Sequence, residues 1–254
     1  MKISIRILAA LISLCATPAL AIVGGGAPSS EGVGRSVVTI VGSRGNFCTG
    51  TLIAPDLVLS AAHCVGPGST YKIVEYDADR QPRLKDVTRI ADHPGFNMQT
   101  MLAHRATADV SLLQLRSPRT APSPIGVPTT PLAAGDHFII AGVGVSIRGD
   151  GKSGGTVRTA DLIATGQPGT LQIRLVDAAS QGTRPGLGAC TGDSGGPVFE
   201  NQQGKPVVIG VISWSTGPNN AGGCGGLTGV TPLTLYRDWI VKTARQWGSA
   251  LAAP

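Results

Sequence analysis

The sequence predicts an all-β fold that ends in one helix. Three observations lead to this prediction: short apolar segments are rich in β-branched residues, turn residues separate them at fairly regular spacing, and 36 glycines and 18 prolines occur among 254 residues. Charged residues make up 14% of the chain and hydrophobic ones 42%, which is typical of a globular protein and excludes a disordered or coiled-coil chain. The length fits one large all-β domain or two smaller ones that share an interface.

The predicted strands share an apolar, β-branched composition and boundaries of glycine, proline or asparagine. They span residues 36–42, 50–53, 57–60, 110–115, 137–142, 171–176, 197–200 and 207–214. Residues 117–131 contain five prolines and almost no apolar pattern, so we expect a linker between two halves of the chain. The helical pattern lies at the end, where apolar residues recur near the 3.6-residue period at Leu235, Trp239, Ile240, Ala244 and Trp247.

Residues 1–21 have the features of an export signal. Lys2 and Arg6 give a positive start, residues 7–14 are apolar, and Ala19-Leu20-Ala21 forms a small-x-small cleavage site. The apolar stretch is shorter than the roughly 20 residues that a membrane span needs. We therefore expect a secreted or periplasmic protein that does not bind a membrane. The net charge of +6 is scattered, without a run of five basic residues, which argues against a nucleic-acid partner.

Four cysteines follow the predicted signal: Cys48, Cys64, Cys190 and Cys224. An even number in an oxidising compartment predicts disulfides, with three possible connectivities. No Cys-x-x-Cys spacing is present, which argues against a zinc site. We expect neither a metal nor a cofactor, and we expect the other histidines, His93, His104 and His137, at the surface or in turns.

The glycine-rich run from Gly192 to Pro197 reads GDSGGP and has the composition of a nucleophile loop. Glycines around Ser194 leave its hydroxyl uncovered and let backbone N–H groups point at one spot. Acyl transfer needs both features, because an accessible oxygen attacks while donors stabilise the developing oxyanion. Taken alone, the same run also fits an ordinary glycine-rich hairpin.

Two further segments carry candidate partners for this serine. Residues 49–65 read TGTLIAPDLVLSAAHCV, with His63 after a predicted strand and beside Cys64. Asp109 opens the apolar segment DVSLLQL. Singly, a histidine next to a cysteine is more often structural, and an aspartate at the head of a strand more often caps a turn. A buried aspartate needs a hydrogen-bond partner such as an imidazole N–H.

Together these segments resemble the chymotrypsin–trypsin family of serine proteases. The sequence IVGG from Ile22 is similar to the family's mature start, and SAAHC, ADVSLLQL, GDSGGP and Ser213-Trp214 follow in the family's order. The resemblance implies two six-stranded antiparallel β-barrels with a C-terminal helix, divided at approximately 22–120 and 121–254, with the active site between them. It also implies two disulfides, Cys48–Cys64 and Cys190–Cys224.

The resemblance assigns roles residue by residue. Ser194 is expected to attack the peptide carbonyl, His63 to transfer the proton, and Asp109 to orient the imidazole. The N–H groups of Gly192 and Ser194 are expected to form the oxyanion hole. These roles imply a serine endopeptidase that acts on proteins or peptides, and we expect it to be a monomer.

The resemblance also implies how the enzyme becomes active. In the family, a newly formed amino terminus pairs with the aspartate before the nucleophile, which here means Ile22 and Asp193. Signal cleavage after Ala21 exposes Ile22 directly, so we expect no propeptide. Asn46 stands where many family zymogens carry a histidine that holds this aspartate in the inactive form. Both departures predict an enzyme that is active once it is exported.

The specificity pocket is expected around six residues, Gly188, Ala189, Ser213, Trp214, Ser215 and Gly229. Gly188 supplies no charge, and no Asp or Glu occurs between residues 201 and 237, so Lys and Arg side chains lack a counterion there. Ile212 stands where glutamate-specific relatives use a histidine. We therefore expect cleavage after neutral, medium to large apolar residues, with Gly229 leaving the pocket deep and Ser215 narrowing one wall.

Two alternatives belong to other classes. A binding module on the same fold requires a missing catalytic residue, and none of the three is missing. An exported esterase uses the same triad, and it differs by hydrolysing activated esters without cleaving peptides.

Overall fold

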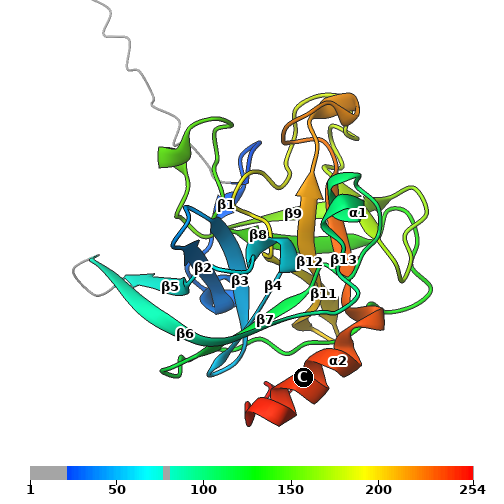
Figure 1. Cartoon of the computed structure of the whole chain (residues 1–254). Helices are drawn as coiled ribbons and strands as arrows, with labels where there is room; N and C mark the ends of the chain where they lie inside the picture. The colour runs from blue at the N-terminus through cyan, green and yellow to red at the C-terminus, as the bar shows by residue number, and fades with distance from the viewer. Residues whose placement is uncertain (1–21, 77–80, 254) are drawn as a thin grey trace, which may run out of the picture.

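Six strands close the first barrel, in the order β2-β3-β4-β7-β6-β5 (Figure 1). The computed structural model describes residues 22–76 and 81–253, so the predicted export signal lies outside the described residues. The strands of this barrel are Val37–Gly42 (β2), Phe47–Ala54 (β3), Leu57–Ser60 (β4), Tyr71–Tyr76 (β5), Pro82–Asp92 (β6) and Ser111–Leu115 (β7).

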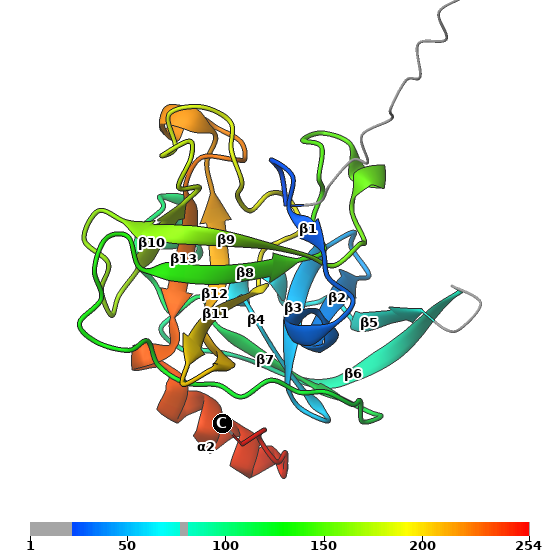
Figure 2. The same ribbon diagram turned by 180° about the vertical axis from the view of Figure 1, so that it is seen from behind.

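The second barrel has the strand order β9-β10-β13-β12-β11-β8 and is closed by the pairing of β8 with β9 (Figure 2). Its strands are His137–Gly142 (β8), Arg158–Thr165 (β9), Ile173–Val176 (β10), Pro197–Gln202 (β11), Lys205–Ser215 (β12) and Thr228–Pro232 (β13). A short strand, Ala27–Pro28 (β1), extends this sheet beside β9. All pairings between named strands are antiparallel, so the predicted fold of two six-stranded barrels is confirmed.

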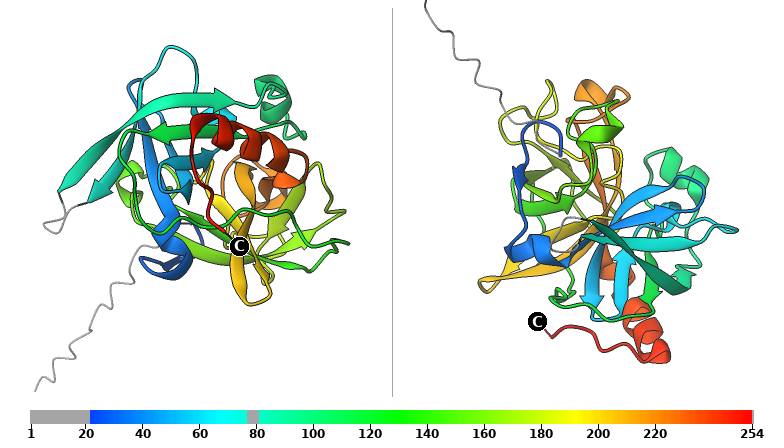
Figure 3. Two further views of the ribbon diagram at one scale, coloured as in Figure 1. Left: turned by 90° about the horizontal axis from the view of Figure 1, so that it is seen from below. Right: turned by 90° about the vertical axis from the view of Figure 1, so that its left-hand side faces the viewer.

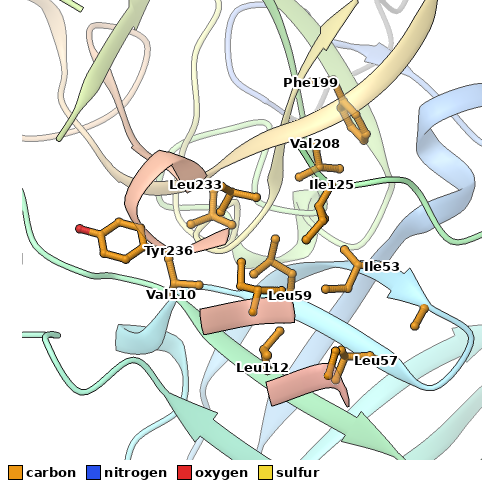
Figure 4. Close-up of a cluster of buried hydrophobic side chains, with 14 of the residues drawn as sticks. Ile53, Leu57, Leu59, Val110, Leu112, Ile125, Phe199, Val208, Leu233 and Tyr236 are labelled. Atoms are coloured by element: carbon orange, nitrogen blue, oxygen red, sulfur yellow. The ribbon is translucent and has the colours of Figure 1, made fainter. Parts of the chain in front are cut away.

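One hydrophobic cluster joins the two barrels. Leu57 and Leu112 from the first barrel lie in the same buried cluster as Phe199 and Val208 from the second (Figure 4). The proline-rich connection contributes Ile125, whose neighbour Gly126 donates its N–H to the carbonyl of Val208. Because apolar side chains from both barrels are buried together, the barrels pack as one unit and hold the residues between them in a fixed arrangement.

The C-terminal helix, Arg237–Trp247 (α2), follows the second barrel but packs at the junction of both (Figure 3). Its buried residues Ile240 and Ala244 belong to the cluster that joins the barrels. Beyond the helix, Ala252 donates its N–H to the carbonyl of Ile53 in β3. The predicted helix is therefore present, and it ties the end of the chain back to the first barrel.

Two disulfides connect Cys48 with Cys64 and Cys190 with Cys224, as the family resemblance implied. The first joins β3 to the turn that carries His63, and the second joins the Ser194 loop to the segment before β13. In the part of the chain that the structure describes, no helix is long and apolar enough to cross a membrane.

Candidate active site

His63 and Asp109 meet because β4 and β7 are neighbours. Antiparallel pairing places Ser60, at the end of β4, opposite Ser111, at the start of β7. The chain therefore leaves β4 and enters β7 at the same end of the barrel. His63 lies in the short 3-10 turn Ala62–Cys64 that follows β4, and Asp109 lies two residues before β7.

Asp109 is fully buried and accepts hydrogen bonds from three groups. Oδ1 accepts from the backbone N–H of His63 at 3.0 Å, and Oδ2 lies 2.8 Å from Nδ1 of the same residue. The hydroxyl of Ser213 also donates to Oδ2. Nδ1 therefore carries the proton that faces Asp109, which leaves Nε2 of His63 as the basic nitrogen on the other side of the ring.

Ser194 lines a cavity of about 550 Å³ together with His63 and Gly192. The cavity lies between the two disulfides, since all four cysteines contribute to its wall. Within the described residues, no hydrogen bond joins Ser194 Oγ to His63 Nε2, a bond that is often long without substrate and tightens in the complex. The structure thus brings the three predicted catalytic side chains to one solvent-accessible site.

The backbone of the Ser194 loop leaves two donors free. Asp193, Gly195 and Gly196 donate their N–H groups to backbone carbonyls, whereas within the described chain the N–H groups of Gly192 and Ser194 have no acceptor. Gly192 has φ of +94°, and a methyl group on it would lie 2.7 Å from the Phe47 ring. Glycine is therefore required at this position, and the two free N–H groups are those expected to form the oxyanion hole.

Thr49 of β3, which was not among the predicted site residues, holds the carbonyls of the same two residues. Its Oγ1 donates to the carbonyl of Gly192 at 2.7 Å, and its N–H donates to the carbonyl of Ser194 at 2.9 Å. Oγ1 also accepts from the N–H of Val143 at 3.1 Å. Thr49 is completely buried, so it fixes the peptide planes of the Ser194 loop from the opposite barrel.

Asp193 is the second fully buried carboxylate of the site. Its oxygens accept from the N–H groups of Gly144 and Cys190, each at 2.8 Å. Burial raises its pKa to about 7, because the desolvation of the charged form outweighs the effect of these two backbone donors. Ile22, its predicted partner, is also completely buried, in a hydrophobic cluster that includes Ala189 and Ile212.

The structure differs from the predicted specificity pocket at one wall. Gly188 and Ala189 lie beside Thr228, whose Oγ1 accepts from the N–H of Ala189 at 3.0 Å and would be 3.5 Å from a methyl group on Gly188. Gly229 instead faces the indole of Trp214, where a methyl group would lie 2.0 Å from the ring. Neighbouring residues of a strand point to opposite faces, so the expectation that Gly229 deepens the pocket is wrong and Thr228 occupies that place.

Trp214 and Ser215 lie at the end of β12, but the indole is covered. His104, predicted at the surface or in a turn, stacks on the ring with centroids 4.5 Å apart and planes 9° from parallel. The guanidinium carbon of Arg174 lies 6.0 Å from the centroid of the same ring. As a result, Trp214 is only 7% exposed. Ser213, which was also predicted to line the pocket, donates its hydroxyl to Asp109.

Cys48, His63 and Cys64 also come close enough together to resemble a metal site. Both sulfur atoms, however, are joined in the first disulfide. A disulfide offers no thiolate ligand, so this group does not fit a metal ion.

Comparisons with known proteins agree with this geometry. The family model described as Trypsin matches residues 22–240. Rhinocerase 4, a snake venom serine protease of Bitis rhinoceros, is 28% identical over 248 residues, which cover 93% of this chain and 94% of that protein. Trypsin of Sus scrofa is 28% identical over 217 residues, covering 79% and 87%.

Two other similarities are more limited in what they show. Serine protease 56 of Mus musculus is 32% identical over 218 residues, which cover 76% of this chain but only 34% of that protein. Among solved structures, human heparin binding protein matches with a TM-score of 0.68 at 24% identity, covering 91% of this chain and all of that one. At this identity the structural match supports the fold.

Proposed function

Because this chain belongs to the trypsin family of serine proteases, we propose that it is a secreted serine endopeptidase with Ser194 as its nucleophile. The observation that carries the proposal is the pairing of His63 with the buried Asp109, beside a cavity that Ser194 also lines. An aspartate, an imidazole and a serine in this order form the arrangement that acyl transfer requires.

The proposed reaction proceeds through an ester on Ser194. His63 Nε2 takes the hydroxyl proton while Ser194 Oγ attacks the peptide carbonyl, and Asp109 stabilises the resulting imidazolium. The free N–H groups of Gly192 and Ser194 stabilise the oxyanion, and each such donor contributes about 3–4 kcal/mol in the transition state. His63 then protonates the leaving amine, and a water molecule activated by His63 hydrolyses the ester.

Activation is proposed to follow directly from cleavage after Ala21. The family model begins at Ile22, the residue that this cleavage makes the amino terminus. The new ammonium group supplies a cation that Asp193 lacks among the described residues, and Ile22 is already buried in the second barrel. Pairing of the two holds the Gly192 N–H toward the cavity, so the exported enzyme needs no propeptide removed.

The proposed specificity is for small to medium neutral side chains before the scissile bond. Within the described residues, no ion pair or side-chain hydrogen bond joins a carboxylate to Gly188 or Ala189. Thr228 fills part of the space beside them. A buried Lys or Arg without a counterion is strongly disfavoured. Ala, Val and Leu should therefore be cut faster than Phe, and all of them faster than Arg or Lys.

One experiment tests the activity and separates it from the esterase alternative. The mature wild type and Ser194→Ala proteins are assayed on casein, on matched peptides and on an activated ester, and a fluorophosphonate probe labels the active serine. We expect peptide hydrolysis and labelling in the wild type and neither in the variant. Ester hydrolysis without peptide cleavage, or peptide cleavage by Ser194→Ala at the wild-type rate, contradicts the proposal.

A further inference from the structure

Arg148 brings a positive charge to the wall of the Ser194 cavity. It lines the cavity together with His63, Ser194 and Gly192. Its guanidinium lies against Gly223, because a methyl group on that glycine would be 2.6 Å from Nη1 of Arg148. Gly223 has φ of +139°, a conformation that favours glycine. The missing side chain at residue 223 thus makes the space in which the guanidinium lies.

The loop that carries Arg148 is held firmly at both ends. Ser153 Oγ accepts from the N–H groups of Ser146 and Ile147, each at 3.1 Å, and so closes the loop around Arg148. Before it, Val145 donates its N–H to the carbonyl of Thr191 at 2.9 Å. Thr191 directly precedes Gly192, so the backbone of Arg148 has a fixed position relative to the oxyanion donors.

Within the described residues, the charge of Arg148 has no counterion. In residues 22–76 and 81–253, none of the ion pairs includes Arg148, and no carboxylate contributes to the wall of the cavity. The nearest acidic residue along the loop, Asp150, uses Oδ1 to accept the N–H of Lys152 at 3.0 Å. A guanidinium in a concave site attracts anions, and its planar donors match the two oxygens of a carboxylate.

We propose that Arg148 is a specificity-determining residue that binds an Asp or Glu side chain of the substrate, within two residues of the scissile bond. This inference rests on the proposed function. It adds a preference for an acidic substrate residue, which the neutral pocket at Gly188 and Thr228 does not explain. One charge-assisted pair of this kind should raise kcat/KM for a Glu peptide roughly tenfold over its Gln counterpart.

The test uses the mature enzyme and peptides that differ at one position. Glu, Gln or Lys is placed in turn at each of the two residues on either side of the scissile bond, and the ratio of kcat/KM values is measured. We expect a Glu-to-Gln ratio of about ten at one position in the wild type. Arg148→Ala should bring that ratio to about one, Arg148→Lys should give an intermediate ratio, and Arg148→Glu should favour the Lys peptide.

Lys152→Ala is the matched control, because Lys152 is exposed in the same loop and does not line the cavity. It should keep the wild-type ratio at every position. An equal loss of the ratio in Lys152→Ala and Arg148→Ala would overturn the proposal, since the effect would then reflect the general charge of the loop.

A binding measurement separates failure of this inference from failure of the proposed function. Calorimetry of the same peptides with the Ser194→Ala protein needs no turnover. Peptide hydrolysis with a ratio near one everywhere overturns the role of Arg148 and leaves the endopeptidase. Arg148-dependent binding of Glu peptides without hydrolysis by the wild type supports the role of Arg148 and overturns the endopeptidase. If the wild type hydrolyses no peptide and the Ser194→Ala protein shows no selective binding, both proposals are overturned.

Discussion

Two fully buried aspartates lie at this site, and the chain stabilises them differently. Asp109 accepts from the imidazole and backbone of His63 and from Ser213. Within the described residues, Asp193 accepts only from the backbone N–H groups of Gly144 and Cys190, and burial raises its pKa to about 7. Folding alone therefore supplies every partner of the first carboxylate. The second one has no cationic partner among the described residues, and we expect cleavage before Ile22 to provide one.

The largest expected effect comes from Asp109→Asn. An asparagine in this place donates to Nδ1 or leaves it without an acceptor, so His63 takes the wrong tautomer and Nε2 no longer acts as a base. We expect kcat to fall by about 10⁴-fold with the fold unchanged. Steady-state kinetics measure the loss, and the imidazole proton between His63 and Asp109 should disappear from the proton NMR spectrum. A loss below tenfold would show that Asp109 does not orient the base.

The next effect concerns the amino terminus. A chain with one extra Met before Ile22 keeps the triad but moves the ammonium group away from Asp193. Because the Gly192 donor then loses its support, we expect kcat to fall by roughly 10²–10³-fold. Mature Ile22→Val protein is the control, since it keeps the amine and a similar side chain, and it should retain most activity. Full activity of the Met-extended chain would rule out the proposed activation.

Comparison of the strands shows which parts of the fold could be predicted from the sequence. Residues 57–60 and 137–142 were predicted with the observed bounds, because each is apolar, β-branched and ends at a turn. Strand β6, Pro82–Asp92, was missed because most of its side chains are exposed, so its sequence lacks an apolar pattern. In β9, the buried face includes Ala160 and Ala164, which are weak strand formers. These two strands form because they pair in register with their neighbours and close the barrels. The sequence of a single segment does not show such pairing.

The site follows the same division. The sequence pointed to His63, Asp109 and Ser194 because their segments, taken together and in this order, resemble one family, although none of the segments is decisive alone. Thr49 and Arg148 were missed because their roles depend on residues far away in the chain, such as Gly192, 143 positions beyond Thr49. Thr228 was missed because a one-residue difference along β13 decides which side chain faces the pocket.

Asp193→Asn tests the difference between the two aspartates through the pH dependence of folding stability. In a chain that keeps a residue before Ile22, the pKa of Asp193 is about 7 against an ordinary 3.8. A carboxyl group whose pKa is higher in the folded state than in the unfolded state stabilises the fold at pH values below its unfolded pKa. This contribution is lost as the pH rises to about 7. The shift of about three units corresponds to a loss on the order of 4 kcal/mol.

We therefore expect the Met-extended chain to lose stability between pH 4 and 7, and Asp193→Asn to stabilise that chain at pH 8. In the mature protein the same variant should be destabilising, because it leaves the Ile22 ammonium group without its partner. Urea unfolding at several pH values measures both effects. Asp238→Asn, on the exposed face of α2, is the control and should change neither. The same sign of effect in both forms would contradict a switch of partner at Asp193.

The smallest expected effect is at Thr49, where the first barrel supports the loop that contains Asp193. Thr49→Val keeps the shape but leaves the Gly192 carbonyl without its donor and the Val143 N–H without its acceptor, which costs about 1–3 kcal/mol of stability. Because the Gly192 peptide is then less firmly oriented, we expect kcat to fall roughly tenfold while KM changes little. Thr49→Ser keeps the hydroxyl and should restore kcat. A loss of stability without a change in kcat would mean that Thr49 joins the barrels but does not position the oxyanion donors.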